Sequence, residues 1–248
     1  MKRTFFLISL LSFVVFTKCQ SKYSVRLTNQ VDPDIVLINI EQGDRAFIGN
    51  LLMKIDSCQP LLIGVDAWFI KEKTETEDSV LVNAFKQIQN DFVTYFFDSS
   101  WQVSKSHEKF TRFVSGEGLA MGNIDNGLQS SFTPVMKVGD KIYEQFALKI
   151  IKHWKPEYNR NFSPGKPVTI NFTRTLEQFF HFDGSLIDDV EKSMLKNKIV
   201  LLGYLGPESE DKHFTPIRMV KKFTDNEPDT YGLVIIANEI RTLLDLDN

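Results

Sequence analysis

The chain has 248 residues, of which 42% are hydrophobic and 25% are charged, a composition typical of a globular protein. Its formal net charge of −3 comes without the basic stripe that a nucleic-acid-binding surface requires, which argues against nucleic acid as a partner. A chain of this length buries enough surface to fold without a metal or a disulfide, and its two cysteines lack zinc-site spacing.

The N-terminus has the pattern of an export signal. Two basic residues follow Met1, and residues 5–16 form an apolar run interrupted only by two serines. As a helix this run spans about 18 Å, short of the roughly 30 Å hydrocarbon core of a bilayer, so it predicts a signal peptide. Cys19, directly after the run, resembles the lipidated cysteine of bacterial lipoproteins. We expect a signal peptide over residues 1–19, lipidation at Cys19 and a polar tether over residues 20–33; a cleaved soluble form and an uncleaved anchor are the alternatives.

The body begins with a predicted strand, helix and strand. Residues 34–41 are rich in β-branched side chains with few polar breaks, the pattern of a strand buried on both faces. Residues 46–55 have helical apolar spacing, and residues 61–66 form a second buried run. Three such elements within about 30 residues predict a βαβ unit with parallel strands.

The remainder contains shorter elements separated by polar loops. A helix capped by Asp78 or Ser79 is predicted to precede a strand over 92–97, and residues 98–120 show no regular period. The elements predicted after them are a short strand over 121–124, a helix over 143–153, a strand over 168–172, a charged helix over 186–197, a strand over 198–202, a loop over 203–228 and an apolar segment over 233–246. Together they predict one α/β domain over residues 34–248, with a mostly parallel or mixed sheet flanked by helices.

Four acidic residues occupy positions where a ligand site is expected. Glu41, Asp66 and Asp211 lie at or just beyond the predicted C-terminal ends of buried strands, the edge at which open parallel sheets bind ligands. Asp78, at a predicted helix start, is expected to join them. Such a pocket would suit an amine, a sugar or a hard cation such as calcium. The alternative is that these carboxylates cap helices and tether loops.

The sequence contains little that indicates catalysis. No nucleophile elbow, phosphate-binding loop or zinc-protease motif is present, and the cofactor, like the ligand, is unknown from the sequence. The Asp211-x-His213 pair leaves open a hydrolase that uses Asp66 and Asp211 with a metal. Trp68 and Trp101 are expected in the core, with a stacking role toward a sugar or aromatic ligand as the alternative.

The order of these motifs resembles the second type of CHASE domain, a family of sensory extracellular domains associated with cyclases and histidine kinases. The resemblance covers nearly the whole body. The matching fragments are Ile40-Glu41, Arg45 with its helix, Pro60 with Ile63–Asp66, Gly122-Asn123, Ile199–Gly203 followed by Asp211 and Thr215-Pro216, and Tyr231–Leu233 with Asn238. It implies an extracytoplasmic α/β sensor without catalysis, in which these residues shape the fold: Arg45, Gly122, Asn123, Thr215, Pro216 and Asn238.

The resemblance also indicates which kinds of partner to expect. Family members usually continue into transmembrane helices and a cytoplasmic kinase or cyclase, whereas this sequence ends four residues after Leu244. We therefore expect a bacterial sensory domain, held at the cell envelope by its lipid anchor, that binds an unknown small molecule and acts with a separate membrane protein. A structural subunit of an envelope complex, without a small ligand, is the alternative.

Overall fold

The computed structural model describes residues 25–209, 211–218 and 226–246. The predicted signal peptide, Cys19 and the first part of the predicted tether lie outside these residues. No helix in the described ranges has the length and apolar character needed to cross a membrane.

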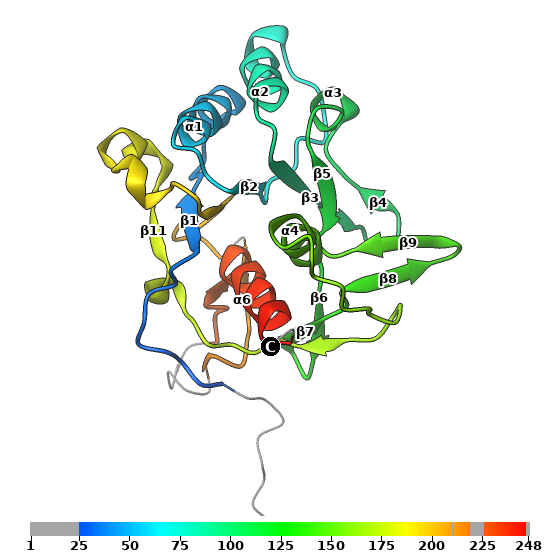
Figure 1. Ribbon diagram of the computed structural model, residues 1–248. Helices are drawn as coiled ribbons and strands as arrows, with labels where there is room; N and C mark the ends of the chain where they lie inside the picture. The colour runs from blue at the N-terminus through cyan, green and yellow to red at the C-terminus, as the bar shows by residue number, and fades with distance from the viewer. Residues whose placement is uncertain (1–24, 210, 219–225, 247–248) are drawn as a thin grey trace, which may run out of the picture.

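A seven-stranded sheet forms the centre of the molecule (Figure 1). Five of its strands follow one another in parallel, and β5 continues the parallel set beside β3 while β4 pairs antiparallel with the end of β3. In order across the sheet they are β11 (Phe180–Asp183), β1 (Ile35–Asn39), β12 (Ile199–Gly203), β2 (Leu62–Val65) and β3 (Asp91–Phe97), with β5 (Gly116–Leu119) and β4 (Val103–Ser104) beyond β3. The predicted α/β domain with a mixed sheet is confirmed.

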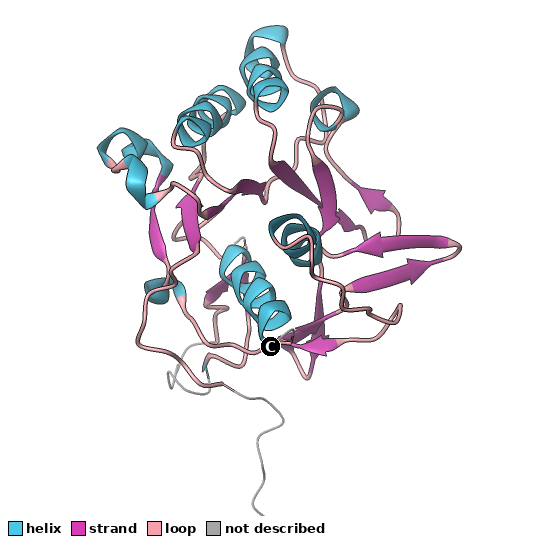
Figure 2. Cartoon of the chain, viewed as in Figure 1, coloured by secondary structure: helices cyan, strands magenta, loops and turns pink. Residues whose placement is uncertain are grey.

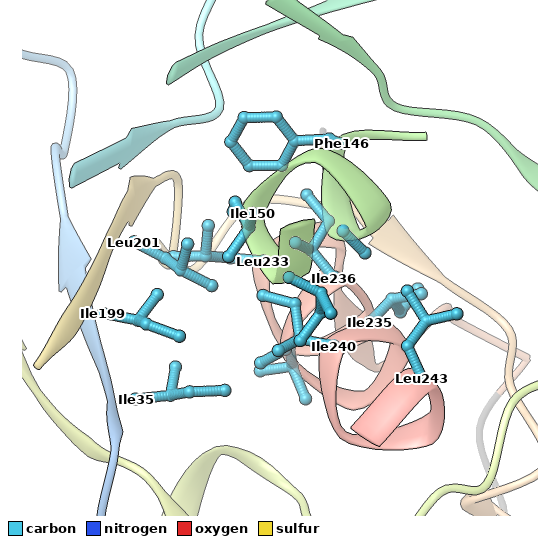
Figure 3. Packing of buried hydrophobic residues seen from close by; sticks show 14 of the residues in the cluster. Ile35, Phe146, Ile150, Ile199, Leu201, Leu233, Ile235, Ile236, Ile240 and Leu243 are labelled. Atoms are coloured by element: carbon cyan, nitrogen blue, oxygen red, sulfur yellow. The ribbon is translucent and has the colours of Figure 1, made fainter. Parts of the chain in front are cut away.

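Helices cover both faces of this sheet (Figure 2). On one face lie α1 (Arg45–Ser57) and α2 (Glu75–Gln87), and on the other lie α4 (Phe146–Trp154) and α6 (Gly232–Asp245). Side chains alternate along β1, so that Val36 and Ile38 join the core under α1 and α2. Ile35 and Leu37 join the opposite core under α4 and α6 (Figure 3). Because both faces are buried, the central strands are uninterrupted apolar runs.

Smaller elements lie outside the seven-stranded sheet. They are β6 (Gly122–Asp125), β7 (Leu128–Phe132) and β10 (Val168–Thr169) in a three-stranded sheet, the hairpin β8 (Val135–Val138) and β9 (Lys141–Glu144), the pair β13 (Lys212–His213) and β14 (Thr230–Tyr231), the short helix α3 (Glu108–Thr111), and the 3₁₀ turns η1 (Leu176–Gln178), η2 (Gly184–Asp189) and η3 (Lys192–Met194).

Several predicted boundaries are wrong. Residues 98–120 include the sheet strand β5, whose sequence Gly-Glu-Gly-Leu has no apolar run to reveal it. The charged helix predicted over 186–197 is a pair of 3₁₀ turns, η2 and η3. The helix predicted from residue 143 begins at Phe146, because Lys141–Glu144 pair with β8. Thr74 rather than Asp78 caps α2, in a capping box with Glu77.

Residues 25–33, assigned by sequence to a tether, lie against the domain. Val25 forms a parallel bridge with Phe172, and the carboxylate of Asp32 accepts the backbone N–H groups of Asp34 and Ile35 at 2.9 Å. The same carboxylate accepts Arg241 Nε at 2.6 Å. Asp32 therefore ties the entry to β1 onto α6.

The residues expected to shape the fold make structural hydrogen bonds. Buried Asn238 accepts the backbone N–H groups of Thr173 and Arg174 at 3.1 and 3.2 Å, which anchors that segment to α6. Thr215, fully buried before the buried Pro216, lies 2.8 Å from the Thr230 hydroxyl. Three further residues of this set also make contacts within the fold. Asn123 Nδ2 donates to the Thr133 hydroxyl at 3.1 Å, Gly122 leaves room for the Gln129 side chain, and Arg45 forms an ion pair with Asp78.

Candidate functional site

A cavity of about 130 Å³ lies beyond the C-terminal end of β2, between the sheet, α6 and β13. We call it the carboxylate cavity, because Asp66, Asp211 and Glu239 line it together with His213. Asp66 follows β2 directly, and its backbone N–H donates to Leu202 at 2.7 Å, which continues the parallel ladder by one residue. The cavity is completed by Trp68, Ala120, Met121, Gly122, Gln129, Gly232, Ile235 and Ile236.

Asp66 is held at the cavity by the neighbouring strand. The hydroxyl of fully buried Thr94, on β3, donates to Asp66 Oδ1 at 2.9 Å. Burial, with a further contribution from the charge of Asp211, raises the pKa of Asp66 to about 7, although the Thr94 hydrogen bond and His213 oppose the shift. Asp66 therefore changes charge near neutral pH.

Glu239 is the most deeply buried carboxyl of the cavity. It lies on α6 and is 4% exposed, and no hydrogen bond or ion pair reaches its side chain from the described residues. Burial, and then the charge of Asp66, raises the pKa of Glu239 well above its ordinary value. Ionising an unpaired carboxyl at such a position is costly, so burial favours the protonated form of Glu239.

Asp211 and His213 lie at the more open side. Their side chains are 31% and 39% exposed, and His213 Nε2 is 3.5 Å from Asp211 Oδ1. The N–H of Gly232 donates to the Asp211 carbonyl at 3.0 Å, which places this residue at the N-terminus of α6. A Cβ at Gly232 would lie 2.7 Å from Asp211 Oδ1, so a larger residue there would displace the Asp211 carboxylate.

The four groups do not form a ready-made metal site. Within the described ranges, no three His, Cys, Asp or Glu side chains converge closely enough to hold a metal ion. Calcium requires six to eight oxygen ligands at about 2.3–2.6 Å, which this donor set does not supply. The cavity instead presents the carboxyl groups of Asp66, Asp211 and Glu239 to a ligand that donates hydrogen bonds. Two of these carboxyls, Asp66 and Glu239, have raised pKa values.

Two of the four predicted acids lie elsewhere. Glu41 is exposed, with a φ of 53°, and accepts a hydrogen bond from Ser185 at 2.9 Å. Asp78 is fully buried in an ion pair with Arg45. Neither residue lines the carboxylate cavity. The structure thus brings together Asp66 and Asp211 and separates them from Glu41 and Asp78.

Glu239 lines the cavity without having been predicted as a site residue. Between Gly232 and Ile240 it is the one charged residue, and it repeats the helical spacing of Gly232, Ile235 and Ile236. That isolated charge is the signal that could have found it. The core positions expected for Trp68 and Trp101 are wrong, because their exposed fractions are 45% and 54%, and Trp68 lines the cavity.

A larger cavity of about 230 Å³ lies near η1 and β14. Its two acidic residues, Glu177 and Asp229, are not buried. It therefore offers no desolvated charge for a ligand to recognise, and the carboxylate cavity is the stronger candidate.

We expect Thr94→Val to raise the pKa of Asp66 further, because the substitution removes a hydrogen bond that stabilises the ionised carboxylate. Removing a hydrogen bond to an ionised carboxylate raises the pKa of that carboxyl by roughly one unit or more. The measurement is a carbon-detected NMR titration of the Asp66 carboxyl. Thr94→Ser, which keeps the hydroxyl, should leave the titration close to that of the unmodified protein, and an unchanged pKa in Thr94→Val would contradict the assignment.

A family model described as the CHASE2 domain matches residues 22–248. No curated protein and no solved structure matches the chain.

Proposed function

Since the chain belongs to the CHASE2 family of extracellular sensory domains, we propose that it is a non-enzymatic receptor component that binds a small ligand in the carboxylate cavity. The supporting observation is Glu239, a carboxyl 4% exposed that faces the cavity without a partner among the described residues. Burying a polar group without a hydrogen bond costs about 1–3 kcal/mol. A ligand that supplies the missing hydrogen bonds would recover that energy on binding.

The proposed function is tested by ligand-induced stabilisation of the full-length chain. The thermal unfolding midpoint is measured with amines, amino acids, sugars, nucleotides and metal salts. A compound present at a hundred times its dissociation constant should stabilise the protein by about 2.7 kcal/mol. Asp66→Asn should abolish the shift, whereas Asp229→Asn, in the larger cavity, should leave it unchanged. A shift that survives Asp66→Asn and is lost in Asp229→Asn would place the ligand in the other cavity.

We further propose that the protein acts at the bacterial cell envelope, attached by a lipid at Cys19, with a separate membrane protein as its output. This proposal is supported by the predicted signal peptide, in which a short apolar run over residues 5–16 is closely followed by Cys19. Cys19→Ser should shift the protein from the membrane fraction to the soluble fraction and abolish incorporation of a labelled fatty acid. Cys58→Ser is the matched control, since Cys58 is buried inside the domain. Equal fatty-acid labelling of the Cys19→Ser protein would overturn lipid attachment.

A further inference from the structure

We infer that the ligand of the carboxylate cavity presents a compact primary ammonium group, which sits between Asp66 and Glu239, and that its binding releases protons from this pair. The inference rests on the proposed function of the cavity and specifies the chemical class of its ligand. It follows from the size of the cavity, from the hydrogen-bonding capacity of its carboxyls and from the charges around them.

The size of the cavity limits the bound group. Its volume is about 130 Å³, and a water molecule occupies roughly 30 Å³ of liquid. The space therefore holds an ammonium head with a short alkyl chain, and it is too small for a whole sugar ring or a nucleotide. A longer ligand would extend past the exposed side chains of Asp211 and His213.

The hydrogen-bonding capacity of the cavity matches an ammonium group. The Thr94 hydroxyl donates a hydrogen bond to Oδ1 of Asp66. No described residue donates to Oδ2 of Asp66 or to the carboxyl oxygens of Glu239. An ammonium group has three donors and no acceptor, which suits ionised carboxylates that only accept. A hydroxyl compound would bring acceptors as well as donors, and an anion would be repelled by the same carboxylates.

The walls suit a short alkyl chain and a cationic head. The apolar lining consists of Met121, Ile235 and Ile236, and Trp68 presents a partly exposed ring at the cavity. The face of an aromatic ring attracts a cation, and tryptophan is the best of the aromatic residues for this contact. A hydrogen-bonded ammonium also avoids the close convergence of ligands that a metal ion needs and that these side chains lack within the described ranges.

Proton release follows from the electrostatics of the pair. The pKa of Asp66 is raised to about 7 and the pKa of Glu239 is raised well above its ordinary value, both chiefly by burial. The titratable groups that face the pair are Asp211 and His213, whereas β3 and β7 present the uncharged Thr94 and Gln129. A cation placed between the two carboxyls favours their ionised forms. The bound state therefore holds fewer protons, and affinity rises with pH.

The test uses ethylammonium chloride as the probe and the full-length chain as the receptor. Binding is followed by NMR at pH 6 and pH 8, with sodium chloride, ethanol and sodium acetate as matched controls. For a ligand of three non-hydrogen atoms we expect a dissociation constant on the order of 1–10 mM at pH 8. We expect affinity at least about tenfold weaker at pH 6, and proton release detected by calorimetry in two buffers of different ionisation enthalpy.

Two variants locate the site independently. Asp66→Asn and Glu239→Gln should each weaken ethylammonium binding at pH 8 at least about tenfold, whereas Glu157→Gln, an exposed glutamate on another surface, should not. The pH series on the unmodified protein needs no variant, so the inference stays testable if one of the two fails to fold. Equal binding of ethanol, pH-independent affinity or binding unaffected by both variants would overturn it.

The outcomes also separate this inference from the proposed function. If ethylammonium does not bind, but another compound stabilises the protein in a way that Asp66→Asn abolishes, the ammonium class is wrong and the ligand-binding site stands. If no compound of any class stabilises the protein, both proposals fail.

Discussion

We expect Asp78→Ala to lower the free energy of unfolding by about 3–5 kcal/mol, the typical cost of removing one partner from a buried ion pair. The side chain of Asp78 is fully buried, and it pairs with Arg45, whose own side chain is 9% exposed. Asp78 Oδ2 also accepts the Lys73 N–H at 3.1 Å and lies 3.2 Å from Lys109 Nζ. The substitution would leave the Arg45 guanidinium buried without its carboxylate. Chemical denaturation at pH 7 measures the loss.

The matched control is Glu75→Ala, on the same helix. Glu75 also lies 3.3 Å from Lys109 Nζ, but its side chain is 83% exposed, so its removal should change stability by no more than about 0.5 kcal/mol. Burial would raise the pKa of Asp78, but hydrogen bonds from Arg45, the Lys73 N–H and Lys109 outweigh it and lower the pKa. The stabilisation is therefore present at neutral pH and is lost only in acid. A loss below about 1 kcal/mol for Asp78→Ala would contradict this structural role and return Asp78 to the candidate ligand residues.

We expect the free energy of unfolding to fall by roughly 2 kcal/mol or more as the pH rises from 5 to 7, because burial favours the protonated forms of Asp66 and Glu239 in the folded state. The pKa of Asp66 is raised to about 7, and that of Glu239 is raised well above its ordinary value. A carboxyl with a raised pKa stabilises the fold below its unfolded pKa and loses that contribution as the pH approaches the folded value. Buried Asp91, whose pKa burial raises to about 6, acts in the same direction.

Glu239→Gln isolates one of these protons. The amide keeps the shape of the side chain and cannot ionise, so the loss of stability between pH 5 and pH 7 should be smaller in this variant than in the unmodified protein. Exposed Glu157→Gln should leave the pH profile unchanged. Denaturation curves at half-unit pH intervals provide the measurement. A Glu239→Gln profile parallel to that of the unmodified protein would show that Glu239 is ionised in the folded state.

The two experiments concern different parts of the molecule. Asp78 secures α1, α2 and the loop after β2, whereas Asp66 and Glu239 lie at the carboxylate cavity on the side of α6. Their effects on stability should therefore be additive. A ligand that binds the cavity should remove part of the pH dependence and leave the cost of Asp78→Ala unchanged.

The central strands and the first helices could be predicted from the sequence. β1, β2 and β12 are apolar runs because both of their faces are buried, and α1 shows its apolar stripe directly in its residue spacing. Asp66 could be placed as well, since a polar residue directly after a buried parallel strand lies at the edge where ligands bind. These features depend on interactions with near neighbours along the chain, which leave a period in the sequence.

The edges of the sheet and the membership of the cavity were decided only by the tertiary structure. β5 and β11 are too short and too polar to show a strand pattern, and they form because β3 and β1 offer free edges for pairing. Glu239 and Asp66 meet only when α6 packs against the sheet, and Asp78 turns away because Arg45 pairs with it. Burial and partner choice depend on residues far apart in the chain. The sequence by itself therefore determined the layers of the fold and pointed to two carboxyls of the cavity, Asp66 and Asp211, and packing decided that Glu239 lines it with them.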